Sequence, residues 1–218
     1  MPLLKICQSP VMGIWKIEET WRDLLDLFQN KSLFTGDVLD IQSEKRKCEW
    51  LATRLLIKYL TGTERPVCYK ENGSPFLHDS YYQISISHTK GYAAVILSRF
   101  DCPGIDIEYP SDRAWKVRAR FMSAEELLLF DSFPDNCLAD NEKKPSQSTL
   151  ATLCWCLKET AFKALQESAV DFIKHLLIEP FTLSERGVVT LTEKKTSQQE
   201  AFAIHYQIAD DYIITWKA

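Results

Sequence analysis

The stretch Gly104-Ile105-Asp106-Ile107-Glu108 alternates apolar and acidic residues, which is the pattern of a β-strand. Successive side chains of a strand point to opposite faces, so Ile105 and Ile107 are predicted to enter the core and Asp106 and Glu108 to share the other face. Taken alone, this pair is also compatible with a solvated sheet edge. Carboxylates suit a Val/Ile-type strand poorly, however, and a second motif downstream favours a functional interpretation.

The second motif spans residues 155–163 and reads Trp-Cys-Leu-Lys-Glu-Thr-Ala-Phe-Lys. On an α-helix Trp155, Glu159 and Lys163 fall at i, i+4 and i+8, so they share one stripe. The default interpretation of a Glu-x-x-x-Lys pair is an ordinary ion pair on a helix surface. If this stripe meets the acidic face of the strand, three carboxylates and one ammonium converge.

Such a convergence predicts a magnesium site. Asp106, Glu108 and Glu159 would supply hard oxygen ligands, and Mg²⁺ completes its coordination with water and phosphate oxygens. Lys163 would lie beside the phosphate and offset its charge. The two motifs therefore predict a magnesium-dependent enzyme that acts on a phosphate ester or anhydride.

In this order, the motifs resemble the signature of the 4′-phosphopantetheinyl transferases, in particular the long, surfactin-type branch. The glutamate of Trp-x-x-Lys-Glu-x-x-x-Lys follows Gly-Ile-Asp-Ile-Glu by 51 residues, and Ile-Ser-Ile-Ser-His-Thr precedes both at 84–89. The resemblance runs from about Lys45 to Leu165, and the length of the chain also fits.

This resemblance implies an α+β fold in which two similar α+β halves pack as an intramolecular pseudo-dimer, with the active site in the cleft between them. We expect an N-terminal half at 1–103, which carries the coenzyme A nucleotide contacts. A C-terminal half at 104–218 would carry the Mg-binding strand and the catalytic helix. The sequence itself shows no internal repeat.

The implied reaction transfers the 4′-phosphopantetheine arm of coenzyme A to a serine hydroxyl of an acyl or peptidyl carrier protein, and it releases adenosine 3′,5′-bisphosphate. Such reactions serve fatty acid, polyketide or nonribosomal peptide biosynthesis. Asp106, Glu108 and Glu159 are predicted to hold Mg²⁺, and Lys163 to stabilise the leaving phosphate. Glu159, directly or through a metal-bound water, is the candidate general base, and Glu108 is the alternative.

Six residues are predicted to contact coenzyme A, namely Arg46, Arg54, Ser87, His88, Lys158 and Lys163. In the family a matching Ser-His pair contacts coenzyme A, with the histidine near its 3′-phosphate. Arginine suits bidentate phosphate contacts. Plainer alternatives exist, because helix arginines are usually exposed and a histidine at a strand end usually caps or packs.

One departure from the family pattern concerns the phosphate cradle. Relatives usually carry Gly-Lys-Pro where this chain has Gly73-Ser74-Pro75. That lysine normally meets a phosphate, so one cation is missing. Lys70 in the same loop is a candidate replacement, and weaker binding of coenzyme A is the alternative.

A basic stretch after the acidic strand is the candidate docking surface for an acidic carrier protein. Residues 113–120 hold four cations, and Phe121 and Met122 are predicted to serve as apolar anchors. The alternative is a solvated basic segment.

Two rival functions also remain, a magnesium-dependent hydrolase of a phosphate anhydride and a catalytically idle relative that binds coenzyme A.

Composition limits the remaining possibilities. The formal net charge of −4 argues against general nucleic-acid binding, and no apolar run is long enough to span a bilayer. Seven scattered cysteines favour reduced thiols over a zinc site or a disulfide framework. We expect a soluble, cytoplasmic monomer.

Periodicity and turn signals predict the order of elements. Helices are expected at 18–28, from Ser43 to just before Gly62, from a capping box at Ser123, and from Leu150 or Leu153 to about Glu167. Strands are expected at 3–17, 82–87, 92–98, 104–108, 180–193 and 200–216. A turn at 72–75 and a loop insertion at 131–149 complete the prediction.

Overall fold

The computed structural model describes residues 3–78, 80–128 and 146–218, and the chain divides into two compact units. The first comprises Met1–Ile107 together with Ala218, and the second comprises Glu108–Lys217. Each unit combines helices with a β-sheet, which confirms the predicted α+β class. The boundary falls inside the strand that carries both acidic residues of the first motif.

The sheet of the first unit has six strands in the order β1-β2-β6-β5-β4-β3. Their bounds are β1 Leu3–Gln8, β2 Val11–Lys16, β3 Val67–Tyr69, β4 Pro75–Leu77, β5 Gln83–Thr89 and β6 Tyr92–Ser98. The single strand predicted at 3–17 is wrong, because β1 and β2 form an antiparallel hairpin. Pro10 lies in its turn and has no amide hydrogen with which to continue a ladder.

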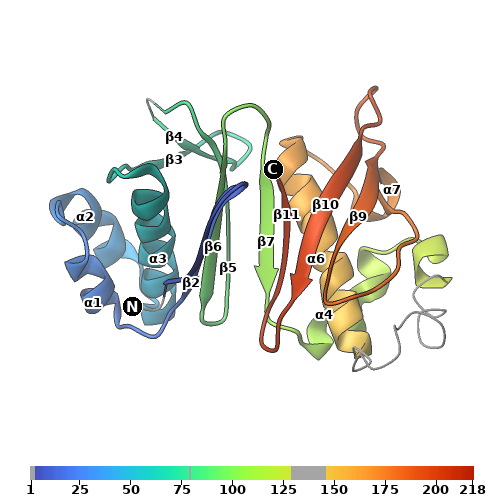
Figure 1. The fold of residues 1–218 in the computed structure, drawn as a ribbon, viewed down its shortest axis with the longest axis horizontal. Coiled ribbons are helices and arrows are strands. Elements are labelled where there is room, and N and C mark those ends of the chain that lie inside the picture. The colour runs from blue at the N-terminus through green and yellow to red at the C-terminus, as the bar shows by residue number, and fades with distance from the viewer. Residues whose placement is uncertain (1–2, 79, 129–145) are drawn as a thin grey trace. The chain divides into compact units, whose positions relative to one another are not determined.

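Three helices lie on one side of this sheet, with α3 nearest to it (Figure 1). They are α1 Trp21–Asp26, α2 Ser32–Asp40 and α3 Glu44–Thr61. The side chain of Ser43 caps α3, and Gly62 ends it in the left-handed conformation, as predicted. Helix α2 was not predicted, and its N-cap residue Lys31 makes no side-chain capping bond.

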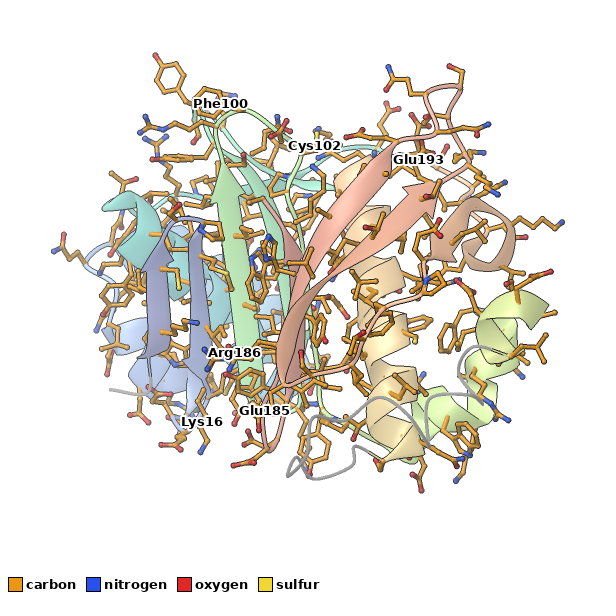
Figure 2. The ribbon with its side chains drawn as sticks, turned by 45° about the vertical axis from the view of Figure 1, so that its right-hand side comes forward. Lys16, Phe100, Cys102, Glu185, Arg186 and Glu193 are labelled. Carbon is orange, nitrogen blue, oxygen red and sulfur yellow. The ribbon has the colours of Figure 1, made fainter. Side chains whose placement is uncertain are left out.

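Helix α3 packs directly on β2 and β6 and forms the centre of the first core. A Cβ atom on Gly13 of β2 would come within 2.8 Å of Leu56 Cδ2 on α3. The glycine therefore permits the close approach of helix and sheet. Phe100 and Cys102 lie in the connection that follows β6 (Figure 2).

The second sheet has the order β7-β11-β10-β9-β8. Its strands are β7 Gly104–Glu108, β8 Leu176–Ile178, β9 Arg186–Glu193, β10 Ala201–Ile208 and β11 Ile213–Lys217. Strand β7 has the predicted bounds. The strand predicted at 200–216 is instead an antiparallel pair, β10 and β11, and β8 was missed. The turn between β10 and β11 is closed by a bond from Ala209 N to Tyr212 O.

The helices of the second unit are α4 Asp112–Val117, the 3-10 helix η1 Arg118–Arg120, α6 Gln147–Leu165 and α7 Phe172–His175. Helix α6 begins earlier than predicted, because Ser146 caps it by accepting a bond from Thr149 N. Most of the predicted loop insertion lies outside the described residues. No described helix is long and apolar enough to cross a membrane.

The capping box predicted at Ser123 is confirmed. Glu126 N donates to Ser123 Oγ at 3.2 Å, and Ser123 N donates to Glu126 Oε2 at 2.7 Å. The helix that follows starts at Ala124 and is described as far as Leu128.

Candidate active site

The first unit brings together two residues predicted to contact coenzyme A. Arg46 in the first turn of α3 contacts the imidazole of His88 near the end of β5, with Nη1 3.3 Å from Nδ1. Glu49, one helical turn after Arg46, places Oε2 3.5 Å from Arg46 Nη1 and 3.3 Å from His88 Nδ1. The sequence reasoning missed this buried carboxylate, although its i,i+3 spacing from Arg46 was a usable signal.

Arg54, two turns further along α3, is a buried cation with only 5% of its surface exposed. Its guanidinium donates to Thr53 Oγ1 at 2.9 Å and to Tyr69 Oη at 3.3 Å, and it lies 4.0 Å from the centre of the Trp50 ring. Among the described residues it forms no ion pair, and its Nε has no hydrogen-bond partner. The alternative interpretation of Arg54 as an exposed arginine on a helix surface is therefore wrong.

The pKa of the Arg54 guanidinium is lowered, chiefly by burial, and the positive charge of Arg46 contributes to the shift. The neighbouring Tyr69 hydroxyl and, to a smaller extent, the negative charge of Asp37 act in the opposite direction. A desolvated cation that senses a second cation is stabilised by any anion that binds between or beside them. The local electrostatics therefore favour an anionic ligand.

Strand β5 holds β7 through the hydroxyls of two serines. Ser85 Oγ accepts from Ile105 N and Ser87 Oγ from Ile107 N, both at 3.2 Å. Ser87 Oγ also donates to Asp106 Oδ1 at 2.8 Å. The structure thus gives Ser87 a role in seating the acidic strand, and its contact with coenzyme A stays a prediction.

Ile105 and Ile107 of the acidic strand are in the core, as predicted. Asp106 is only 4% exposed, so it is not part of a solvated edge. Glu108, the last residue of β7, is half-buried. A buried carboxylate is costly unless donors or cations compensate it, and Ser87 provides one such donor.

The predicted stripe of α6 is its more accessible face. Trp155, Glu159 and Lys163 are half-buried, whereas most of the residues between them are buried. Trp155 contacts the rings of Phe121 and Phe172, with centroid separations of 5.2 and 5.7 Å. An acidic and a basic side chain are thus presented beside an aromatic wall.

Lys158 is enclosed by the protein, whereas a residue that contacts a ligand must be accessible to it. Its side chain has 0% exposure, and its Nζ donates to Glu126 Oε2 at 2.6 Å and to Phe172 O at 2.9 Å. Burial lowers the pKa of the Lys158 ammonium, while the charge of Glu126 opposes that shift. This placement argues against the prediction that Lys158 contacts coenzyme A.

The remaining predicted features lie at the surface. Lys70 and Ser74 belong to one turn, in which Lys70 N donates to Ser74 O at 2.9 Å. The basic stretch forms α4 and η1, and its Lys116 and Arg120 are exposed. Phe121 and Met122 are core residues, with 2% and 3% exposure, so their prediction as interface anchors is wrong.

The fit of magnesium depends on the donor atoms that the predicted ligands offer. Asp106, Glu108 and Glu159 offer only carboxylate oxygens, which suits Mg²⁺. Within residues 3–78, 80–128 and 146–218, however, no three His, Cys, Asp or Glu side chains are grouped so that they could hold a metal ion. The fit therefore rests on donor type alone.

Comparison with known proteins agrees with the motifs. The family model described as the 4′-phosphopantetheinyl transferase superfamily (ACPS) matches residues 103–217, which is more than half of the chain. The match contains Asp106, Glu108, Glu159 and Lys163, whereas the Arg46–His88 cluster lies before it. A search of the curated proteins found no match. The chain therefore belongs to the 4′-phosphopantetheinyl transferase superfamily.

Proposed function

We propose that this protein transfers the 4′-phosphopantetheine arm of coenzyme A to a serine hydroxyl of an acyl or peptidyl carrier protein, in a magnesium-dependent reaction. Family membership supports phosphopantetheinyl transfer in general. The observation that carries the proposal is Arg54, a buried cation without an ion pair among the described residues. Such a group is suited to the anionic nucleotide end of coenzyme A.

The proposed nucleotide contacts are Arg46, Arg54 and His88, with Ser87 beside them. Arg46 and His88 would hold the 3′-phosphate, since both present N–H groups from one cluster. Lys70 is proposed as a substitute for the cation missing at Ser74, because both lie in the same turn. We also assign the chain to the surfactin-type, pseudo-dimeric branch, on the basis of its two motifs.

The reaction forms a bond between the serine Oγ and the phosphorus on the pantetheine side, and it breaks the pyrophosphate bond. Adenosine 3′,5′-bisphosphate leaves with the bridging oxygen. Glu159 takes the serine proton, with Glu108 as the alternative base, and Lys163 stabilises the leaving phosphate. Mg²⁺ held by Asp106, Glu108 and Glu159 would supply polarisation of the pyrophosphate oxygens.

The partner surface is assigned to α4 and η1. Lys116 and Arg120 are exposed there, whereas Arg118 stacks on Trp115 at 3.5 Å. The surface around the modified serine of a carrier protein is generally acidic, so these cations are suited to attract it.

The six described cysteines are free thiols, which supports a reducing, cytoplasmic setting. We propose that the protein acts as a monomer.

Mass spectrometry tests the proposal directly. An apo carrier protein incubated with coenzyme A, Mg²⁺ and this protein should gain the mass of one phosphopantetheine arm. Breakdown of coenzyme A in the absence of a carrier would instead identify a hydrolase. Binding of coenzyme A without either reaction would identify an idle relative.

A further inference from the structure

The two residues that flank Glu159 on α6 are both polar and both fully buried. Lys158 and Thr160 have 0% exposure, although Glu159 between them is half-buried. Buried polar groups cost free energy unless they are bonded, so their partners decide what they contribute. Each is bonded to a different element of the second unit.

Lys158 is tied to Glu126, whose carboxylate joins three elements. Glu126 Oε2 accepts from Lys158 Nζ at 2.6 Å and from Ser123 N at 2.7 Å, and Oε1 accepts from Ile178 N at 2.8 Å. Lys158 Nζ also donates to Phe172 O on α7 at 2.9 Å. One carboxylate thus links α6 to the Ser123 helix start and to the end of β8.

Thr160 ties the opposite side of the same turn to β11. Its hydroxyl lies 2.6 Å from the hydroxyl of Thr215, which donates to Cys156 O at 2.9 Å. Thr215 is also fully buried. The bonds run from α6 to β11 and back to α6, so neither sliding nor rotation of the helix can occur without breaking them.

We propose that Glu126, Lys158, Thr160 and Thr215 are positioning residues, which fix the part of α6 that presents Glu159 and Lys163 to the reacting phosphate. The inference rests on the proposed transfer function and adds to it the residues that hold the catalytic helix. Displacement of a catalytic group by about 1 Å can cost on the order of a hundredfold in rate. A positioning role therefore predicts a change in kcat, whereas a ligand contact predicts a change in KM.

The test compares two sets of variants. Glu126→Gln combined with Lys158→Met neutralises the pair, so that no unpaired charge remains buried. It should lower kcat by about tenfold to a hundredfold and leave the KM for coenzyme A within about twofold. Thr160→Val should lower kcat by at least about threefold, and Thr160→Ser, which keeps the hydroxyl, should restore it. Glu193→Gln, which replaces one acceptor oxygen of a buried carboxylate at the end of β9, is the control and should retain kcat.

A raised KM with unchanged kcat would overturn the inference, as would an equal fall in kcat for Glu193→Gln. Hydrogen exchange gives a second measurement, in which the amides of 158–163 should exchange about tenfold faster in the double variant while those of β9 and β10 are unchanged. If the wild-type protein modifies no carrier, the proposed function is wrong. Hydrogen exchange alone then tests whether these residues hold α6 in place. Unchanged exchange at 158–163 would then overturn the positioning role.

Discussion

His88 and Arg46 are in contact, although 42 residues separate them in the sequence. The contact joins the end of β5 to the first turn of α3, and Glu49 lies within 3.5 Å of both side chains. Two groups that can each donate to a phosphate are thus held together by contacts within the protein. Such preorganisation lowers the cost of binding.

Removal of either member should weaken binding of the 3′-phosphate. For His88→Ala and Arg46→Ala, the KM for coenzyme A is expected to rise by about tenfold to a hundredfold, since one charge-assisted contact is lost. The KM for 3′-dephospho-coenzyme A should change much less. Steady-state kinetics with both compounds makes the comparison, and equal effects would remove these residues from the 3′-phosphate site.

Arg54 is expected to lower the stability of the fold and to strengthen the binding of coenzyme A. Arg54→Met removes a buried cation without an ion pair among the described residues, so the free energy of unfolding is expected to rise by about 1–3 kcal/mol while the KM for coenzyme A increases at least about tenfold. Lys58→Met is the matched control on the same helix. Lys58 is paired with Glu64 at 2.7 Å, so its loss should lower stability and leave the KM unchanged. Urea unfolding and kinetics together measure both quantities.

The acidic residues are expected to be essential for transfer but not for folding. Asp106→Asn keeps an acceptor for the Ser87 hydroxyl, and Glu159→Gln keeps the shape of a half-buried side chain. Each should abolish transfer while the thermal unfolding midpoint changes little. Activity near that of the wild type at limiting Mg²⁺ would refute the metal assignment.

Glu193 should make stability depend on acid pH. It is fully buried at the end of β9 (Figure 2), where its carboxylate accepts from Lys195 N and Thr196 N at 2.9 Å and from Glu200 N at 3.1 Å. Burial alone would raise the pKa of Glu193, but the hydrogen bonds from Thr196 and from the backbone produce a net lowering.

Because the pKa of Glu193 is lower in the folded protein, its stabilisation is complete above the unfolded pKa of about 4.3 and is lost as the pH falls through the folded pKa. Glu193→Gln should therefore cost about 1–3 kcal/mol near pH 7, and the difference from wild type should shrink at acid pH. Urea unfolding between pH 7 and pH 3 tests this. If the difference in the free energy of unfolding between wild type and variant stays constant over this pH range, the Glu193 carboxylate is not its cause.

Charge reversal on α4 and η1 should slow carrier binding. Lys116→Glu combined with Arg120→Glu is expected to lower the association rate and to flatten its dependence on salt, because rim charges act mainly on the on-rate. The KM for coenzyme A should stay the same. If stopped-flow association is insensitive to the reversal, the carrier docks elsewhere, with residues 131–149 the next candidate.

Several elements of the fold can be predicted from residues that are close together in the sequence. The caps of α3, the capping box at Ser123 and the strand β7 all depend on residues close in sequence, and all three appear as predicted. The surroundings of Lys158 were not predictable in this way. Its partner Glu126 lies 32 residues earlier, and the pairing depends on how α6 packs. Phe121 was misassigned for the same reason, since it follows a basic surface segment and yet enters the core.

The burial of Lys158 also has a consequence for chemical modification. Amine-acylating reagents need an accessible, uncharged amine, and this ammonium has no exposed surface and is paired with a carboxylate. Lys163, five residues later, is half-buried, so part of its surface is open to solvent. The two lysines of one motif therefore differ in reactivity while the fold is intact, and acylation of Lys158 would report that the surroundings of α6 have opened.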